Sequence, residues 1–167
     1  MTRLQAQAEN AVVIQKARPR DQGEIFRLIA EQRRADAGQA SRTYRDYFTR
    51  QKRPRDQVLV ARTQGKIIGV SGYWHDDYSD SGIYWLGWTY VPPGFQGRGI
   101  GQKLLDRVIQ ELKKRKARKL YADTSSRPLY RRALRFYRAN GFKREGRFKD
   151  YYQKGEDQMV MGKEIGK

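Results

Sequence analysis

The sequence predicts an α/β (α+β) fold, in which helices pack on a mixed sheet. Strand-like and helical patterns alternate through the middle of the chain, and strand-like segments dominate both ends. Residues 100–112 carry the clearest amphipathic pattern, with apolar side chains at helical spacing. Because such a helix must bury its apolar stripe against another element, we expect helices layered on a sheet.

The first elements are predicted before residue 57. A short β-prone run at 12–16 precedes a helix, whose start is indicated by Asp21 with Glu24 three residues later, the pattern of a capping box. Residues 37–56 are polar, basic and weakly periodic, so we expect only a short helix within loops there. The apolar stripe of the first helix consists of Ile25, Leu28 and Ile29.

A hairpin and an aromatic strand are expected next. Residues 58–62 and 66–74 are rich in β-branched and aromatic side chains, and the short polar connection between them favours a β-hairpin. Residues 83–91 predict a central strand. Its Gly87 indicates a bulge or a close approach of backbone. The strand must end at Pro92, because proline cannot donate a ladder hydrogen bond.

The second half of the chain continues this alternation. Residues 118–124 predict a strand, and a helix that follows it is closed by Asn140 and Gly141. Residues 142–148 and 159–165 predict two final strands, which we expect to be antiparallel. The apolar face of the last helix is expected to consist of Leu129, Ala133, Phe136 and Tyr137.

Length and composition set the class of protein. At 167 residues the chain predicts one domain, residues 1–167, with a flexible segment at 1–10. The absence of cysteine excludes disulfides and thiolate zinc sites, and His75 is the only histidine, so we expect no metal site. No apolar run approaches the length of a membrane span, and the first ten residues lack a signal-peptide pattern. We therefore expect a cytoplasmic protein with no membrane partner.

The formal net charge of +18 is a second strong signal. It favours attraction to polyanions such as nucleic acid or an anionic membrane, or to a phosphorylated cofactor. The alternative is that Lys and Arg simply solvate the outer faces of helices. The same charge repels a polycationic substrate unless acidic residues gather locally.

Glycines recur at positions 97, 99 and 101, between the aromatic strand and the amphipathic helix. The first N–H groups of a helix have no partner inside it, and the macrodipole adds partial positive charge there. Glycine allows the necessary φ angles and leaves no Cβ in the way of a ligand. The segment therefore predicts a backbone anion site. It is not a common nucleotide motif, because neither GxxxxGK[ST] nor GxGxxG occurs.

The run QGRGIG, residues 96–101, resembles the Q/R-x-x-G-x-G/A signature of the GNAT superfamily of N-acetyltransferases, which binds the pyrophosphate of acetyl-CoA. Residues 14–29 are similar to the family's first strand and helix, and the segment from Asp150 is similar to the end of many members. A further match, to the family pattern A-x-x-F/L-Y-x-x-x-G-F, consists of Ala133, Phe136, Tyr137, Gly141 and Phe142.

This resemblance implies a GNAT-like mixed, mostly antiparallel central sheet of about seven strands flanked by about four helices. It implies an acetyl-CoA-dependent N-acetyltransferase whose acceptor is a primary amine, on a protein N-terminus, a lysine or a small molecule. The expected mechanism is direct transfer in a ternary complex. The expected assembly is a monomer or a homodimer.

Tyr137 and Asp123 are the candidate catalytic residues. The resemblance places the family's tyrosine acid at Tyr137, whose phenol stays protonated at neutral pH because the reference pKa of tyrosine is about 10. Asp123 lies near the end of a predicted strand, where some relatives carry a glutamate that deprotonates the amine through water. If the alignment with these relatives is shifted, the position of their glutamate falls on Ser125 instead. The alternatives are that Tyr137 is a core aromatic residue and that Asp123 caps a turn or pairs with Arg118.

The contacts with acetyl-CoA follow from helix geometry and the resemblance together. Backbone amides of residues 97–102 are expected to hold the pyrophosphate, and the main chain of residues 89–91 to pair with the pantetheine arm like an added strand. At the position of Tyr130, relatives often carry an asparagine that contacts pantetheine. In this chain the same contact requires the phenol of Tyr130 to take the place of the asparagine. The candidate cofactor-binding residues are Thr89, Tyr90, Val91, Gln96, Gly97, Arg98, Gly99, Ile100, Gly101, Gln102 and Tyr130.

Two further groups have alternative interpretations. Asp76, Asp77 and Asp80 form an acidic loop that either guides an amine substrate or is a solvated turn. Trp88 and Tyr90 share one face of a strand and either cage a cationic substrate or pack across strands.

A different class of function also stays open. The chain is alternatively a basic nucleic-acid- or ribosome-associated binding module on the same fold, with its arginine-rich surface as the binding part. The two functions are compatible, since a basic acetyltransferase can modify a substrate bound to RNA. Three arginines are assigned either to the adenosine 3′-phosphate of the cofactor or to a solvated basic face, namely Arg131, Arg132 and Arg135.

Overall fold

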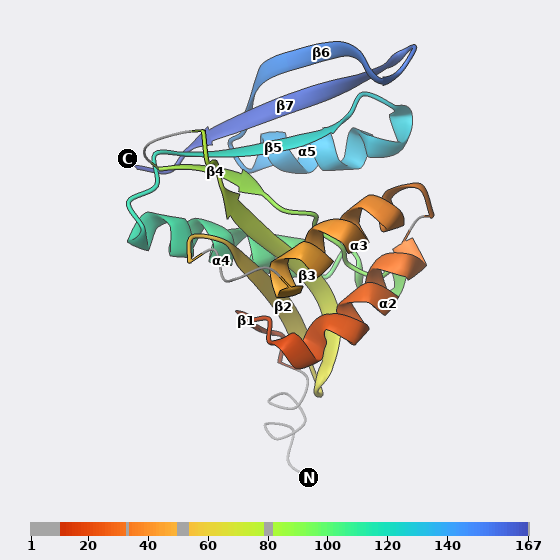
Figure 1. Ribbon diagram of the computed structural model, residues 1–167, viewed down its shortest axis with the longest axis vertical. Coiled ribbons are helices and arrows are strands. Elements are labelled where there is room, and N and C mark those ends of the chain that lie inside the picture. The colour runs from red at the N-terminus through yellow and green to blue at the C-terminus, as the bar shows by residue number, and fades with distance from the viewer. Residues whose placement is uncertain (1–10, 33, 50–53, 79–81, 167) are drawn as a thin grey trace. The chain divides into compact units, whose positions relative to one another are not determined.

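The computed structural model describes residues 11–32, 34–49, 54–78 and 82–166 (Figure 1). The predicted flexible segment at 1–10 lies outside the described residues. The chain folds into two compact units, the first made of Met1–Trp74 and Gly87–Glu111 and the second of His75–Leu86 and Leu112–Lys167. This division into units does not test the prediction that residues 1–167 form one domain, which stays a prediction.

The first unit holds a three-stranded antiparallel part of the sheet and most of the longer helices. The hairpin predicted around residues 63–65 is confirmed, because its two strands pair in antiparallel register from Thr63 opposite Lys66 onward. Its turn uses positive φ angles at Gln64 (48°) and Gly65 (76°). The elements are β1 (Val13–Lys16), α2 (Gln22–Gln32), α3 (Arg34–Thr49), β2 (Gln57–Thr63), β3 (Lys66–His75, ending in the second unit) and α4 (Ile100–Lys114, likewise).

The second unit is built on a mixed set of strands. β4 and β5 are parallel, whereas β5 with β7 and β6 with β7 are antiparallel, which confirms the predicted pairing of the two last strands. The elements are β4 (Ile83–Leu86), β5 (Lys119–Ser125), α5 (Arg131–Ala139), β6 (Lys143–Gln153) and β7 (Glu156–Glu164).

The seven strands are ordered β1-β2-β3-β4-β5-β7-β6 in one mixed sheet. Within the described residues, four α-helices accompany it. The predicted fold class is therefore confirmed. In this same part of the chain, no helix has the length and apolar character needed to cross a bilayer.

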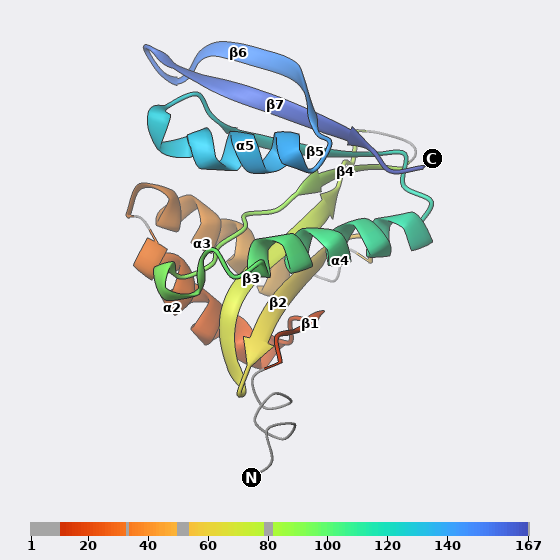
Figure 2. The ribbon, with the colours of Figure 1, turned by 180° about the vertical axis from the view of Figure 1, so that it is seen from behind.

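Helices cover both faces of the strands in the first unit. Side chains of α2 and α3 pack with Val58 and Val60 of β2 and with Val70 of β3 in one buried cluster. Gly69, the neighbour of Val70, points to the opposite face, where an added Cβ would lie 3.0 Å from Ile100 and 3.2 Å from Leu104 of α4. The first turns of α4 (green in Figure 2) therefore pack closely on β3.

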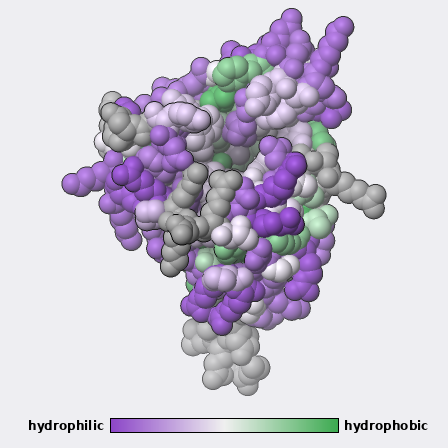
Figure 3. All heavy atoms as spheres, in the orientation of Figure 1, coloured by the Kyte–Doolittle hydropathy of each residue, from purple (hydrophilic) through white to green (hydrophobic). Residues whose placement is uncertain are grey.

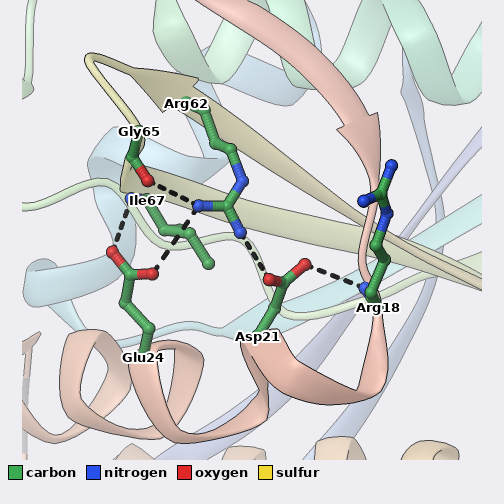
Figure 4. A network of polar contacts seen from close by, with 6 residues as sticks. All are labelled: Arg18, Asp21, Glu24, Arg62, Gly65 and Ile67. Carbon is green, nitrogen blue, oxygen red and sulfur yellow. Dashed lines mark hydrogen bonds and ion pairs between the residues drawn. The ribbon is translucent and has the colours of Figure 1, made fainter.

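The start of α2 differs from the predicted capping box. Asp21 ends a short 3₁₀ turn, and its carboxylate accepts the N–H of Arg18 at 2.9 Å. Glu24 instead accepts the N–H of Ile67 at 2.7 Å, from the neighbouring hairpin. Arg62 joins the two carboxylates, 2.5 Å from Asp21 and 3.7 Å from Glu24 (Figure 4). A tertiary partner thus replaces the local one that the pattern predicted.

Two predicted boundaries were wrong. Residues 34–49 form the continuous helix α3 rather than a short helix within loops, because the few apolar side chains that it buries, such as Ala40 and Tyr44, are spaced to face the core. The aromatic strand predicted at 83–91 stops at Leu86. Beyond it, only Tyr90 forms a bridge, to Val70.

Gly87 does mark a close approach of backbone, as predicted. Its N–H donates to the carbonyl of Gly72 at 2.8 Å, and an added Cβ would lie 3.2 Å from the ring of Trp74. The last helix confirms the predicted closure, since Gly141 has φ +79°. Leu129, however, lies outside its apolar face and is 56% exposed, because a 3₁₀ turn at Pro128–Tyr130 precedes the helix.

Candidate functional site

In the first unit, the segment that leads into α4 is held by contacts between its own residues. After the bridge at Tyr90, the chain forms a 3₁₀ turn at Pro93–Phe95. The side-chain amide of Gln96 donates to the carbonyl of Val91 at 2.8 Å, and the guanidinium of Arg98 lies 5.4 Å from the ring centre of Phe95. These contacts hold the glycine segment at the helix start.

The glycines of this segment supply conformation and open space. Gly97 and Gly99 have φ of +77° and +74°, a region that favours glycine, and an added Cβ at either would meet nothing within 4 Å. Gly101 has the same open space. The glycines are therefore not required for packing within the chain, and their surface is free to receive a ligand.

The first turn of α4 begins directly after Gly99. The first intrahelical bond runs from the N–H of Lys103 to the carbonyl of Gly99 at 3.0 Å. The N–H groups of Ile100 and Gly101 precede it and belong to the set that a helix start leaves for an anion. Ile100 is 2% exposed, so its buried side chain fixes the turn. This cradle fits the pyrophosphate of acetyl-CoA.

The extended residues before the loop are also ordered by hydrogen bonds. Tyr90 and Val70 exchange both backbone hydrogen bonds at 2.9 Å, so the main-chain groups of Tyr90 are engaged within the unit. In extended chain, neighbouring residues direct their backbone groups to the opposite side, so the main-chain groups of Thr89 and Val91 point away from Val70, and the carbonyl of Val91 accepts the side-chain amide of Gln96. The Thr89 hydroxyl lies 2.7 Å from that of Ser71. The side chain of Gln102 donates to Asp106 at 2.8 Å.

Trp88 and Tyr90 pack rather than form an open cage. Their rings are stacked, with centroids 6.3 Å apart and planes 9° apart, and both are partly buried against the core cluster of the first unit. The carbonyl of Trp88 also accepts the hydroxyl of the buried Tyr44. Burial raises the pKa of Tyr44 well above its ordinary value, so this hydroxyl stays a donor.

In the second unit, Asp123 lies near enough to Tyr137 for its negative charge to act on the phenol. Asp123 is exposed on β5, and its Oδ2 accepts the side-chain amide of Gln158 at 2.6 Å and the hydroxyl of Tyr152 at 3.4 Å. Burial raises the pKa of Tyr137, and the negative charge of Asp123 raises it further. The same two causes, in the same order, raise the pKa of Tyr152.

Tyr137 is held by aromatic neighbours on α5. Its ring centre lies 6.0 Å from that of Phe136 and 5.4 Å from that of the buried Phe142. Tyr130 ends the 3₁₀ turn before α5 and is half-buried. The ring of Tyr137 is thus half-buried and lies against the buried Phe142, while its hydroxyl remains a protonated donor at neutral pH.

The remaining candidate residues of the second unit have surroundings of their own. Ser125, the alternative to Asp123, is buried and donates to Glu156 at 2.6 Å. Asp76 accepts the indole N–H of Trp85 at 2.8 Å and the backbone N–H of Tyr78 at 2.9 Å, which favours a structured turn. Asp77 is exposed, and Asp80 lies outside the described residues. Three arginines lie exposed on α5, namely Arg131, Arg132 and Arg135.

Sequence reasoning missed Gln158 and Tyr152. They lie 35 and 29 residues from Asp123 in the chain, and only the β5–β7 and β6–β7 pairings bring them to it. In the register, Ser125 lies opposite Gln158, so Gln158 reaches Asp123 diagonally. Spacing along the sequence carries no signal for such a contact.

Comparisons with known proteins identify the family of the chain. The profile of the acetyltransferase (GNAT) family matches residues 23–142. The N-alpha-acetyltransferase RimI of Mycobacterium tuberculosis is 30% identical over 114 residues, which cover 68% of this chain and 69% of that protein.

Solved structures share the fold. A GNAT-family protein from Desulfovibrio desulfuricans superposes with a TM-score of 0.85 at 24% identity, covering 93% of this chain and 99% of that one. A structure from Salmonella typhimurium with its cofactor acetyl-CoA superposes with a TM-score of 0.70 at 21% identity, covering 93% and 95%.

The predicted family, enzyme class and acetyl donor are thereby confirmed. The individual site residues stay predictions. The chain belongs to the acetyltransferase (GNAT) family and is an acetyl-CoA-dependent N-acetyltransferase.

Proposed function

We propose that this enzyme acetylates the α-amino group of a protein N-terminus, by direct transfer in a ternary complex with acetyl-CoA. The exposed carboxylate of Asp123, whose negative charge acts on the protonated phenol of Tyr137, carries the proposal. The activity named for the mycobacterial relative supports the choice of an α-amine. Lysine and small-molecule amines are the competing acceptors.

The glycine segment is proposed to bind the donor. Acetyl-CoA supplies the acetyl group as an activated thioester. Backbone amides of residues 97–102 bind its pyrophosphate, and the main chain of Thr89 and Val91 pairs with its pantetheine arm. Gln96 and Arg98 take part chiefly by fixing the loop, since Gln96 bonds Val91 and Arg98 covers Phe95.

Asp123 is proposed as the general base. The nucleophile must be a neutral amine, and an α-amino group has a reference pKa of about 7.7–8.0, against about 10.4 for lysine. Much less free energy is therefore needed to deprotonate an α-amine at neutral pH. Asp123 takes the proton through a water, while Gln158 and Tyr152 hold Oδ2 in place.

Tyr137 is proposed as the general acid toward the departing sulfur. Its raised pKa keeps the hydroxyl protonated at every physiological pH. The same shift makes full proton transfer to a thiolate, whose reference pKa is about 8.5, more unfavourable. Tyr137 therefore acts mainly by donating a hydrogen bond that stabilises the thiolate. Tyr130 is proposed to contact pantetheine in place of the family's asparagine.

The test follows CoA release with matched acceptors. A peptide with a free N-terminus and no lysine should be acetylated, whereas the same peptide with a blocked N-terminus and one lysine should not. Tyr137→Phe should lower kcat by about 10²-fold and leave the acetyl-CoA-induced rise in melting temperature unchanged. Preferential acetylation of the lysine peptide or of small amines would overturn the choice of acceptor, and unchanged turnover in Tyr137→Phe would overturn the assigned acid.

A second function, nucleic-acid binding, is favoured by the net charge of +18. Hydrophilic residues cover most of the face seen in Figure 3. An enzyme that binds RNA can meet an acceptor protein that is itself RNA-bound. Filter binding over a salt series tests this, because affinity that arises from phosphate contacts falls steeply with salt. Lack of binding at low salt would limit the charge to a role in solubility.

A further inference from the structure

The hairpin of β6 and β7 exposes a group of aromatic rings. Phe148 is 56% exposed, Tyr151 58% and Tyr152 43%. Among the described residues, six large apolar or aromatic side chains are exposed, and these three lie on one strand. We refer to Phe148, Tyr151 and Tyr152 as the hairpin aromatic surface. Burial of aromatic side chains normally stabilises a protein, so the shared exposure of these three indicates a surface that binds a ligand.

The three rings form a contiguous group. The ring centres of Phe148 and Tyr151 lie 6.2 Å apart, and those of Tyr151 and Tyr152 lie 5.0 Å apart. β6 is the last strand of the sheet, so its outer edge has no neighbouring strand within the described part of the chain. The rings therefore offer faces of different tilt, 51° and 89° between neighbours, rather than one flat wall.

A fixed irregularity of the backbone displays these rings. The register of β6 against β7 shifts between Phe148 and Gln153, and Asp150 within this stretch has φ +53°. Asp157 of β7 accepts the N–H of Asp150 at 2.9 Å, which holds the irregular stretch in place. Since the backbone is fixed, little conformational entropy is lost when a ligand binds to the rings.

The strand that carries the rings is basic. Residues 143–154 contain five cationic and two anionic side chains. Both anionic side chains have local partners, since Glu145 pairs with Lys119 at 2.8 Å and Asp150 accepts the N–H of Gly155 at 2.6 Å. Lys149 and Lys154 are exposed on either side of Tyr151 and Tyr152 along the chain.

We propose that the hairpin aromatic surface, with Lys149 and Lys154, binds single-stranded nucleic acid. Bases stack on the exposed rings and the lysines neutralise phosphates, which is how sequence-tolerant binding to single strands is achieved. An acidic peptide complements the charge but offers no planar groups to the rings. The proposal rests on the second function proposed above and assigns it a surface.

The test measures binding of a labelled single-stranded oligouridine to the full chain by fluorescence anisotropy, without acetyl-CoA or acceptor. Phe148→Ala/Tyr151→Ala should weaken binding at least about fivefold. Lys149→Gln/Lys154→Gln should reduce the slope of log affinity against log salt by about 1.4. The matched controls are Leu129→Ala, which removes an exposed apolar side chain of the same unit, and Lys113→Gln/Lys114→Gln, which removes the same charge from the end of α4.

The outcomes separate this surface from nucleic-acid binding in general. If the hairpin variants and the controls weaken salt-dependent RNA binding equally, the hairpin aromatic surface is not the binding site, although the second function is retained. No binding by the wild type at low salt would overturn both. Equal competition by polyglutamate, by anionic vesicles or by duplex RNA would overturn the stacking proposal. Should Phe148→Ala/Tyr151→Ala not fold, Phe148→Leu/Tyr151→Leu keeps apolar bulk while removing the ring faces, and the same loss of affinity is expected.

Discussion

The side-chain amide of Gln158 donates a 2.6 Å hydrogen bond to Oδ2 of Asp123 across the β5–β7 pair. Asp123 is exposed, and its contact with the hydroxyl of Tyr152 is longer, at 3.4 Å, so the amide of Gln158 is the stronger constraint on its carboxylate. In the proposed mechanism this carboxylate takes the proton of the acceptor amine. Gln158 is then a positioning residue, which acts through the orientation of Asp123.

Substitution of Gln158 should therefore change the pH profile as well as the rate. Gln158→Leu should lower kcat about tenfold at unchanged KM for acetyl-CoA, against about 10²-fold for Asp123→Asn. Gln158→Glu should move the acidic limb of kcat/KM to higher pH, because a like charge disfavours the ionised carboxylate. Gln153→Glu, an exposed position on β6, is the control. If the acidic limb of kcat/KM does not move in Gln158→Glu, Asp123 is not the general base.

The glycine segment offers a comparison that separates ligand binding from backbone strain. Gly99 and Gly155 have φ of +74° and +81°, and an added Cβ at either meets nothing within 4 Å. Alanine at either position should cost about 1–2 kcal/mol of stability, from the left-handed conformation alone. Only Gly99→Ala should also reduce the rise in melting temperature that acetyl-CoA causes. An equal ligand-induced rise in both variants would argue against pyrophosphate binding at this loop.

The features that could be predicted from the sequence are those with local physical causes. The apolar spacing from Ile100 to Leu112 predicted α4, and the glycines before it predicted a helix start with open space. Asn140 followed by Gly141 predicted the end of α5, and Gly141 does adopt the left-handed conformation that glycine favours after a helix.

The features that could not be predicted depend on contacts between distant segments. Glu24 fits a capping box, yet its partner is Ile67 of the hairpin. Among the described side chains of α3, only Ala40 and Tyr44 are buried, so its polar sequence gave little sign of the positions that pack on the core. Gln158 meets Asp123 through strand register, which is set by the whole sheet. A single sequence carries no measure of these pairings.

Asp157 should make the stability of the hairpin depend on pH. Its carboxylate accepts the N–H of Asp150 and the guanidinium of Arg147, at 2.9 and 2.5 Å, and these contacts lower its pKa. A lowered folded-state pKa stabilises the fold at pH above the unfolded value, about 3.9, and this contribution is lost as pH falls below it. Asp157→Asn should therefore melt earlier than wild type at pH 7 and approach it near pH 3. A constant difference across this range would exclude the linkage.

Arg62 should contribute more to stability than any exposed arginine, because it neutralises Asp21 in a place that water reaches poorly. The side chains of Asp21 and Arg62 are 5% and 18% exposed, and their closest atoms are 2.5 Å apart (Figure 4). Arg62→Met leaves the Asp21 carboxylate with the N–H of Arg18 and no cation, which should lower the free energy of unfolding by about 3 kcal/mol.

Arg20→Met, exposed in the same turn, is the control and should change the free energy of unfolding by less than about 0.5 kcal/mol. The double variant Asp21→Asn/Arg62→Met should recover much of the loss, since it removes the buried charge that the single variant leaves unpaired. Urea unfolding of the four proteins measures all of these values, and a loss in Arg62→Met no greater than that in Arg20→Met would show that Arg62 contributes no more than a surface residue.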